Sequence, residues 1–83
     1  MKFKANIDIM PLETLLDPQG KAVSANMKNV GLNEISNVRI GKHITLIIEA
    51  SNKEIASEKI NDACQKILSN QIMESYNFSI EEL

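Results

Sequence analysis

Apolar and polar residues alternate at the start of the chain. Between residues 3 and 9 every second side chain is apolar, and the side chains between them are polar or charged: Phe3, Ala5, Ile7 and Ile9 against Lys4, Asn6 and Asp8. A period of two predicts a strand with one buried face. Pro11 is typical of the end or edge of a strand, because it lacks the N–H that a strand ladder needs. Residues 12–16 form an apolar-rich connector.

A helix is predicted to follow this connector. Asp17 is a favourable N-cap, and Pro18 suits the first helical position, where no N–H donor is needed. Gly31 tolerates the left-handed backbone that commonly ends a helix. Between these ends, apolar residues recur at the i, i+4, i+7 spacing of one helix face: Val23, Met27 and Val30.

Residues 36–50 have the composition of extended chain, interrupted once at Gly41. The apolar residues of this stretch occupy even positions: Val38, Ile40, Ile44, Leu46 and Ile48. A two-residue hairpin at Gly41 would put the side chains of residues 40 and 44 on opposite faces, because one residue of register flips every side chain. The stretch is therefore either two strands joined by a three-residue turn or one long strand bent at Gly41.

The length of this stretch favours the long strand. Residues 36–50 would span about 50 Å when extended, whereas a compact domain of 83 residues has a diameter of roughly 30 Å. A strand that overshoots its own domain needs another chain to pair with. We therefore expect a homodimer in which the chains share strands, with a tetramer as the alternative.

The second half of the chain predicts one more helix and one more strand. Ser51 and Glu54 have the spacing of a capping box, Asp62 and Lys66 that of a favourable i,i+4 ion pair, and Asn70 suits a left-handed helix end. The apolar stripe of this helix contains Ala56, Ile60, Ala63, Cys64, Ile67 and Leu68. The last strand places Tyr76, Phe78 and Ile80 on one face.

The resulting order is β-α-β-α-β, in which the middle β element is one long, bent strand or two strands. This order indicates an α+β sandwich related to the ferredoxin-like fold, with two helices on one face of an antiparallel sheet. Residues 1–83 are expected to form a single domain, because the chain is short and shows no linker, repeat or low-complexity segment.

Composition and charge exclude several classes of function. Hydrophobic residues make up 43% of the chain, charged residues 24%, and the net charge is −2, as in a soluble globular protein. Without a basic stripe, and with aromatic residues at only 4%, nucleic-acid binding is not expected. No apolar run approaches the roughly 20 residues of a membrane span. A cytoplasmic protein is expected.

The side chains most often used in catalysis have ordinary structural interpretations here. Cys64, the single cysteine, lies on the apolar face of the second helix and is interpreted as a small buried hydrophobe. His43, the single histidine, is interpreted as an exposed strand or turn residue. No acid–base pair and no metal-ligand cluster can be nominated, so catalytic, cofactor-binding and metal sites are all predicted to be absent.

Two local features are not explained by the fold alone. Gly20 lies inside the first turn of the first helix, where glycine costs about 1 kcal/mol relative to alanine. It would be useful if another backbone had to approach that turn. The second feature is the positive charge around Gly41 in an acidic chain. The candidate contacts for a partner protein are therefore Asp17, Pro18, Gln19, Gly20, Lys21, Arg39, Gly41 and Lys42.

The chain resembles the PurS family, the small subunit of phosphoribosylformylglycinamidine (FGAM) synthase. Three segments carry the resemblance, in this order: LLDPQGKAV (15–23), NVRIGKHITLIIE (37–49) and ACQKILSNQIMESYNF (63–78). DPQGKAV and VRIGK are the most specific parts. One departure is visible, because the family often has proline after the asparagine that follows the second helix, and this chain has Gln71 there.

The resemblance implies a function that periodicity does not reveal. It implies a non-catalytic subunit of the complex that converts formylglycinamide ribonucleotide (FGAR), glutamine and ATP into FGAM, glutamate, ADP and phosphate in purine biosynthesis. It also implies two partners, a PurQ-type glutaminase and a PurL-type synthase that uses ATP and magnesium. The small subunit would bridge them as a dimer and assist ammonia transfer.

Other functions remain open from the residues alone. An ACT-like regulatory module that senses a small molecule shares the broad topology and often acts as a dimer. A small ferredoxin-like hydrolase such as an acylphosphatase would need a phosphate-cradling loop, and the sequence shows none.

Overall fold

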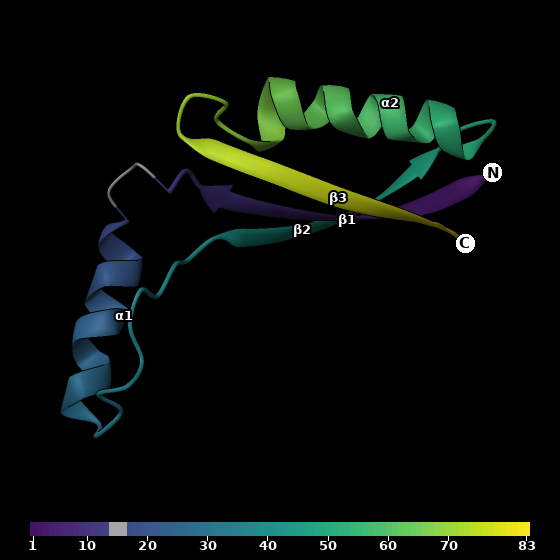
Figure 1. The fold of residues 1–83 in the computed structure, drawn as a ribbon. Helices are drawn as coiled ribbons and strands as arrows, with labels where there is room; N and C mark the ends of the chain where they lie inside the picture. The colour runs from purple at the N-terminus through teal and green to yellow at the C-terminus, as the bar shows by residue number, and fades with distance from the viewer. Residues whose placement is uncertain (14–16) are drawn as a thin grey trace.

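The computed structural model describes residues 1–13 and 17–83. Its elements follow the order β1 (Lys2–Pro11), α1 (Pro18–Asn29), β2 (Lys42–Glu49), α2 (Lys53–Ala63), a π-helical turn η1 (Cys64–Leu68) and β3 (Glu74–Glu82) (Figure 1). The antiparallel α+β class expected from the sequence is therefore confirmed. The end of the predicted connector, residues 14–16, lies outside the described residues.

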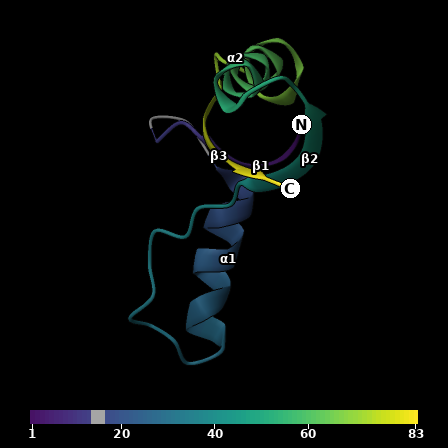
Figure 2. The ribbon, with the colours of Figure 1, turned by 90° about the vertical axis from the view of Figure 1, so that its right-hand side faces the viewer.

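The sheet is three-stranded and antiparallel, with β1 between β2 and β3. Ile7 lies opposite Ile44 on one side and Phe78 on the other, so the apolar positions of all three strands share one face. α2 covers this face (Figures 1 and 2). The buried core consists of Phe3, Ala5, Ile7, Ile9, Ala56, Ile60, Cys64 and Ile80.

α1 does not lie on the sheet, so the expectation of two helices on one face is wrong within a single chain. α1 projects from the end of the sheet, away from α2 (Figures 1 and 2). The chain after Asn29 returns alongside this helix, and we call α1 with the returning segment the arm, residues 17–41. The arm makes the chain 51 Å long, with a radius of gyration of 16.5 Å instead of the about 12 Å of a compact domain of this length.

The extended stretch also differs from both sequence alternatives. β2 begins only at Lys42, and residues 35–41 form neither a second strand nor part of a long one in the described chain. The reason is the length of the neighbouring strand. Residues 42–49 lie beside Ile9 to Lys2 of β1. Because β1 ends at Pro11, only residues 40 and 41 still have a position on β1 opposite them, and residues 36–39 pass beyond its end.

Both ends of α1 follow the sequence pattern. The Asp17 side chain accepts a hydrogen bond from the Gly20 N–H at 3.0 Å, as an N-cap should. At the other end Gly31 has a φ of 81°, and the Leu32 N–H donates to the Met27 carbonyl at 2.9 Å. This is the geometry of a Schellman motif.

The ends of α2 correct two expectations. The N-cap is Asn52, whose side chain accepts from the Ile55 N–H at 2.8 Å, so the predicted capping box from Ser51 does not form. Asn70 does not adopt the left-handed conformation that was expected at the end of this helix. Among the described residues other than glycine, positive φ occurs at Asn37 instead. The chain instead leaves α2 through the π-turn η1. The predicted Asp62–Lys66 ion pair is confirmed at 3.0 Å.

We expect the α2–sheet core to carry the stability of the fold. Replacing Ile60, which is 2% exposed, with alanine should lower the free energy of unfolding by about 2–5 kcal/mol, because a cavity remains. Ile47, which is 65% exposed on β2, is the matched control, and its replacement with alanine should change stability by no more than about 0.5 kcal/mol. Urea denaturation at one protein concentration measures both. Equal losses would contradict this placement of the core.

Candidate functional site

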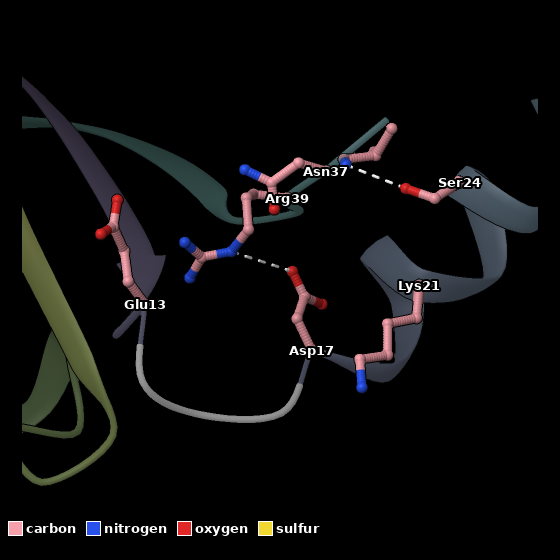
Figure 3. A pocket seen from close by; sticks show the side chains of 7 residues that line it. Glu13, Asp17, Lys21, Ser24, Asn37 and Arg39 are labelled. Atoms are coloured by element: carbon pink, nitrogen blue, oxygen red, sulfur yellow. Dashed lines mark hydrogen bonds and ion pairs between the residues drawn. The ribbon is translucent and has the colours of Figure 1, made fainter. Parts of the chain in front are cut away.

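The candidate partner-contact residues gather where β1 ends and where α1 and β2 begin. One cavity in this region lies between the first turns of α1 and the returning segment (Figure 3), and it is lined by Glu13, Asp17, Lys21, Ser24, Asn37, Val38 and Arg39. A second is lined by Pro11, Asp17, Pro18, Gln19, Ile40, Gly41, Lys42 and Glu74. The structure thus brings together residues that are more than twenty positions apart in sequence.

Asp17 is the centre of this junction. One carboxylate oxygen accepts from the Gly20 N–H and the other from the Ile40 N–H, each at 3.0 Å. The second oxygen also lies 3.6 Å from the Nε of Arg39 (Figure 3). The Gly20 bond, then the Ile40 bond and the Arg39 charge hold the pKa of Asp17 below its ordinary value. Asp17 therefore caps α1 and fastens the returning segment to it.

Arg39 is engaged within the chain. Its guanidinium pairs with Asp17 and donates a hydrogen bond to the carbonyl of Pro11, at the end of β1. The side chain is only 22% exposed. Arg39 thus links β1, α1 and the returning segment, and its charge is paired within the chain.

Gly20 is needed because this chain's own backbone approaches it. A Cβ built at Gly20 would lie 2.2 Å from the carbonyl oxygen of Val38. The expectation that a partner's backbone approaches this turn is therefore corrected: the approaching segment is residues 37–40. Ser24 reinforces the approach, because its hydroxyl accepts from the Val38 N–H at 2.9 Å.

Gly41 has a comparable role where β2 begins. A Cβ there would lie 2.2 Å from the carbonyl oxygen of Ile9 and 2.3 Å from the sulfur of Met10. The returning segment can enter the sheet beside β1 only because this position lacks a side chain. The interruption that the sequence showed at Gly41 is therefore the point where the arm joins the sheet.

The remaining candidates face outward. Pro18, Gln19 and Lys21 are exposed on the first turn of α1, and Lys21 extends away from the Asp17–Arg39 pair (Figure 3). The side chain of Lys42 is 54% exposed and lies 3.9 Å from Glu74. These side chains form the accessible part of the junction, and they carry most of its unburied positive charge.

Several residues of the junction had no signal in the sequence. Glu13, Ser24 and Asn37 line the first cavity, but nothing in their local spacing points to it. Asn37 offers a partial exception, because its φ of 56° is a conformation that asparagine tolerates better than most residues. Their proximity depends on how the returning segment folds back on α1, which is not a local property.

The chain's histidine and cysteine do not belong to this site. His43 is 52% exposed on the sheet face away from α2, and its Nδ1 lies 2.6 Å from the carboxylate of Asp8, its neighbour across the strands. Cys64 is fully buried, and desolvation raises the pKa of its thiol. Both sequence interpretations are confirmed. Residues 1–13 and 17–83 contain no group of three or more His, Cys, Asp or Glu side chains placed to hold a metal ion.

Neither α1 nor α2 is long and apolar enough to cross a membrane, and the same holds for any helix in the described residues.

Comparisons with known proteins give one consistent result. The family model described as PurS, phosphoribosylformylglycinamidine (FGAM) synthase, matches residues 4–82. A Bacillus subtilis protein described as synthase subunit PurS is 35% identical over 81 residues, 98% of this chain and 95% of that protein. A Synechocystis protein of the same description is 39% identical over 70 residues, 84% of this chain and 70% of that protein.

Two solved structures agree in fold over nearly the whole chain. A structure of PurS from Bacillus subtilis matches with a TM-score of 0.86 at 35% identity and covers 96% of this chain and 99% of its own. A chain in a structure described as PurLQS from Thermotoga maritima matches with a TM-score of 0.89 at 31% identity, covering 98% of this chain and 99% of its own.

The Asp17 junction predicts a specific dependence of stability on pH. Because the pKa of Asp17 is lowered by folding, its contribution is present above the unfolded value and is lost as the pH falls through the folded value. Asp17→Asn should be less stable than the natural chain at neutral pH, and the difference should shrink as the pH falls below the ordinary aspartate value and through the lowered folded value, where the Asp17 side chain loses its charge. Urea denaturation across this range measures the difference. A gap that stays constant with pH would contradict the role of the charge.

Proposed function

Because this chain belongs to the PurS family and is a subunit of FGAM synthase, we propose that it bridges a PurQ-type glutaminase and a PurL-type synthase and assists ammonia transfer between them. The single observation that carries this proposal is the likeness to a chain of the PurLQS structure, which extends over the sheet and the arm together. The arm does not contribute to the hydrophobic core of this chain.

The chemistry is assigned to the partners. The complex would convert FGAR, glutamine and ATP into FGAM, glutamate, ADP and phosphate, with ATP and magnesium bound by the synthase subunit. The buried Cys64, with its raised pKa, is not an activated nucleophile. We propose that residues 1–83 form one PurS-like domain and that it works in the cytoplasm.

We further propose that the exposed part of the junction contacts one of these subunits. Asp17, Gly20 and Arg39 hold the junction together from inside. Pro18, Gln19, Lys21, Gly41 and Lys42 form its outer surface. With Lys21 and Lys42 accessible, this surface fits an acidic patch on the partner.

The arm supports a homodimer in which chains share strands. The N–H groups of Val38 and Ile40 are bonded to Ser24 and Asp17 of α1. The N–H groups of successive residues point in alternate directions along an extended segment. The N–H groups of Arg39 and Gly41 therefore face away from α1. β2 is likewise an edge strand with a free side. Two such edges are suited to pair with each other by β-strand addition.

Apolar surfaces support the same arrangement. In α1, Val23 and Met27 are half-buried, and Val30, the C-cap just after the helix, is 68% exposed, although no sheet lies against them. On β2, the core-facing residues Ile44, Leu46 and Ile48 stay half-buried, because α2 packs mainly over β1 and β3.

A second copy could cover both surfaces. If the partner's arm lay along β2, its α1 would lie beside α2, and two chains together would complete the arrangement of two helices on one face. A two-fold axis makes this exchange reciprocal. A tetramer would need a further contact between such dimers.

The dimer proposal predicts the effect of changing one residue on α1. Met27→Glu puts a charge on the apolar face and should raise the dissociation constant of the dimer at least about tenfold. Lys28→Glu, the matched control on the exposed side of the same helix, should leave the dimer intact. Sedimentation velocity over a range of concentrations measures both. A monomeric natural chain, or a dimer that tolerates Met27→Glu, would contradict the proposal.

The bridging role predicts that FGAM formation depends on this chain when glutamine supplies the nitrogen, but not when ammonium does. With purified PurL- and PurQ-type subunits from the same organism, omitting this chain should lower glutamine-dependent FGAM formation at least about tenfold. FGAM formation from added ammonium should stay nearly unchanged, because free ammonia bypasses the transfer. Loss of both activities would indicate a role in the synthase reaction itself, and loss of neither would refute the proposed function.

A further inference from the structure

One edge of the sheet continues beyond the sheet into the arm. Residues 35–41 contain no turn or bend, and they lead directly into β2. β1 and α1 lie on one side of this stretch, and no other helix or strand of the described chain runs along its opposite side (Figure 1). We call the backbone of residues 39–49 on that open side the free edge.

The hydrogen bonds of β2 show which of its backbone groups belong to the free edge. Continued by one residue, the register of β1 and β2 places Met1 opposite Ala50, and the Ala50 N–H donates to the Met1 carbonyl at 3.0 Å. In an antiparallel pair, hydrogen-bonded residues alternate with residues that are not bonded to each other. The even-numbered residues of β2 therefore bond to β1. The backbone groups of its odd-numbered residues point to the free edge: His43, Thr45, Ile47 and Glu49.

The arm continues the same alternation. Val38 and Ile40 donate their N–H groups to side chains of α1, so the even-numbered residues again face inward. The N–H groups of the odd-numbered residues, Arg39 and Gly41, point the other way. α1 thus takes the place that a neighbouring strand would have, and residues 39–49 present one continuous row of backbone groups at odd-numbered positions.

A second copy of this chain fits the free edge because both copies present the same alternation. A two-fold axis perpendicular to the sheet makes the two edges antiparallel and keeps both apolar faces on one side. Odd-numbered residues must then lie opposite odd-numbered residues, since only those carry backbone groups that point across the edge. A shift of a single residue would leave these groups unbonded.

One register uses the whole free edge. When Ile44 of one copy lies opposite Ile44 of the other, Arg39 lies opposite Glu49, and every odd-numbered residue between them has a partner. A shift of two residues in one direction would put Glu49 opposite Asn37, where φ is 56° and the extended chain ends. A shift in the other direction would put Arg39 opposite Ser51, where the chain bends into α2.

The side chains favour the same register. Ile44 is half-buried at the margin of the core, and contact with its own copy would remove more of its apolar surface from water. Glu49 would face the cationic Arg39 of the other copy, and facing opposite charges stabilise a sheet. A register centred on Lys42 would instead set two ammonium groups opposite each other, which is destabilising.

Resting on the strand-sharing dimer of the proposed function, we propose that residues 39–49 of two copies pair antiparallel about a two-fold axis beside Ile44. His43 of each copy then lies opposite Thr45 of the other. The two three-stranded sheets join into one continuous sheet. Backbone hydrogen bonds at the odd-numbered positions hold the interface together, and apolar side chains at the even-numbered positions extend both cores across it.

Single cysteine variants, expressed alone and in pairs, test the register. His43→Cys and Thr45→Cys change exposed side chains on the sheet face away from α2, and Ser79→Cys is the matched control on the same face of β3. The purified proteins are oxidised and separated on a non-reducing gel. The natural chain measures the background, because its Cys64 is fully buried. Sedimentation velocity reports the oligomeric state of each variant.

The pair of His43→Cys with Thr45→Cys should form disulfide-linked dimers at least about tenfold faster than either variant alone, because only this pair brings two sulfur atoms to directly opposite positions. Ser79→Cys should stay at background with either variant. Faster linking of His43→Cys alone or of Thr45→Cys alone would move the axis to that residue and overturn the register. A mixed pair that links no faster than the Ser79→Cys pairs would overturn it too.

Amide hydrogen exchange tests the free edge in the natural chain. The N–H groups of Thr45 and Ile47 should exchange at least about tenfold more slowly in the dimer than in the chain diluted to monomer, because pairing removes them from water. Equal exchange would overturn the proposal. A chain that stays monomeric at every concentration would refute the strand-sharing dimer as well. A dimer of another register would refute only the pairing, since glutamine-dependent FGAM formation tests the bridging role separately.

Discussion

The double hydrogen bond to the Asp17 carboxylate is the interaction on which the shape of this chain depends. One oxygen caps the first turn of α1 and the other holds the Ile40 N–H. Arg39 adds a link to the end of β1. Together they fasten the returning segment to α1 and tie both to the end of β1. An elongated chain with a free backbone edge and an uncovered helix face is the result.

This shape suits a chain whose role is to connect other proteins. The buried hydrophobic core draws its residues from β1, β3, α2 and η1, and none of them comes from the arm. The arm adds length, an unpaired edge and apolar surface, which a solitary domain would need to hide. For a subunit of FGAM synthase, these features provide surfaces for a second copy and for other subunits.

Much of the fold follows from local patterns. The alternation of β1 predicted both its strand and its buried face, and the even-numbered apolar residues of β2 face α2 as their parity required. Asp17 and Gly31 marked the ends of α1 correctly. The predictions were wrong where a neighbouring residue or another backbone geometry could replace the one that the local pattern favoured. Asn52 displaced Ser51 as the N-cap of α2, and the π-turn removed Ile67 from a stripe that its spacing had placed in the core.

By itself the sequence determined the order and type of most elements, the buried faces of the three strands and, through its resemblance, the family. Those depend on spacing within a few residues and on short motifs. The tertiary structure alone decided that α1 leaves the sheet, that Gly20 accommodates Val38, and that Asp17 reaches Ile40. These contacts join residues roughly twenty positions apart, and local spacing carries no information about the path by which the chain brings them together.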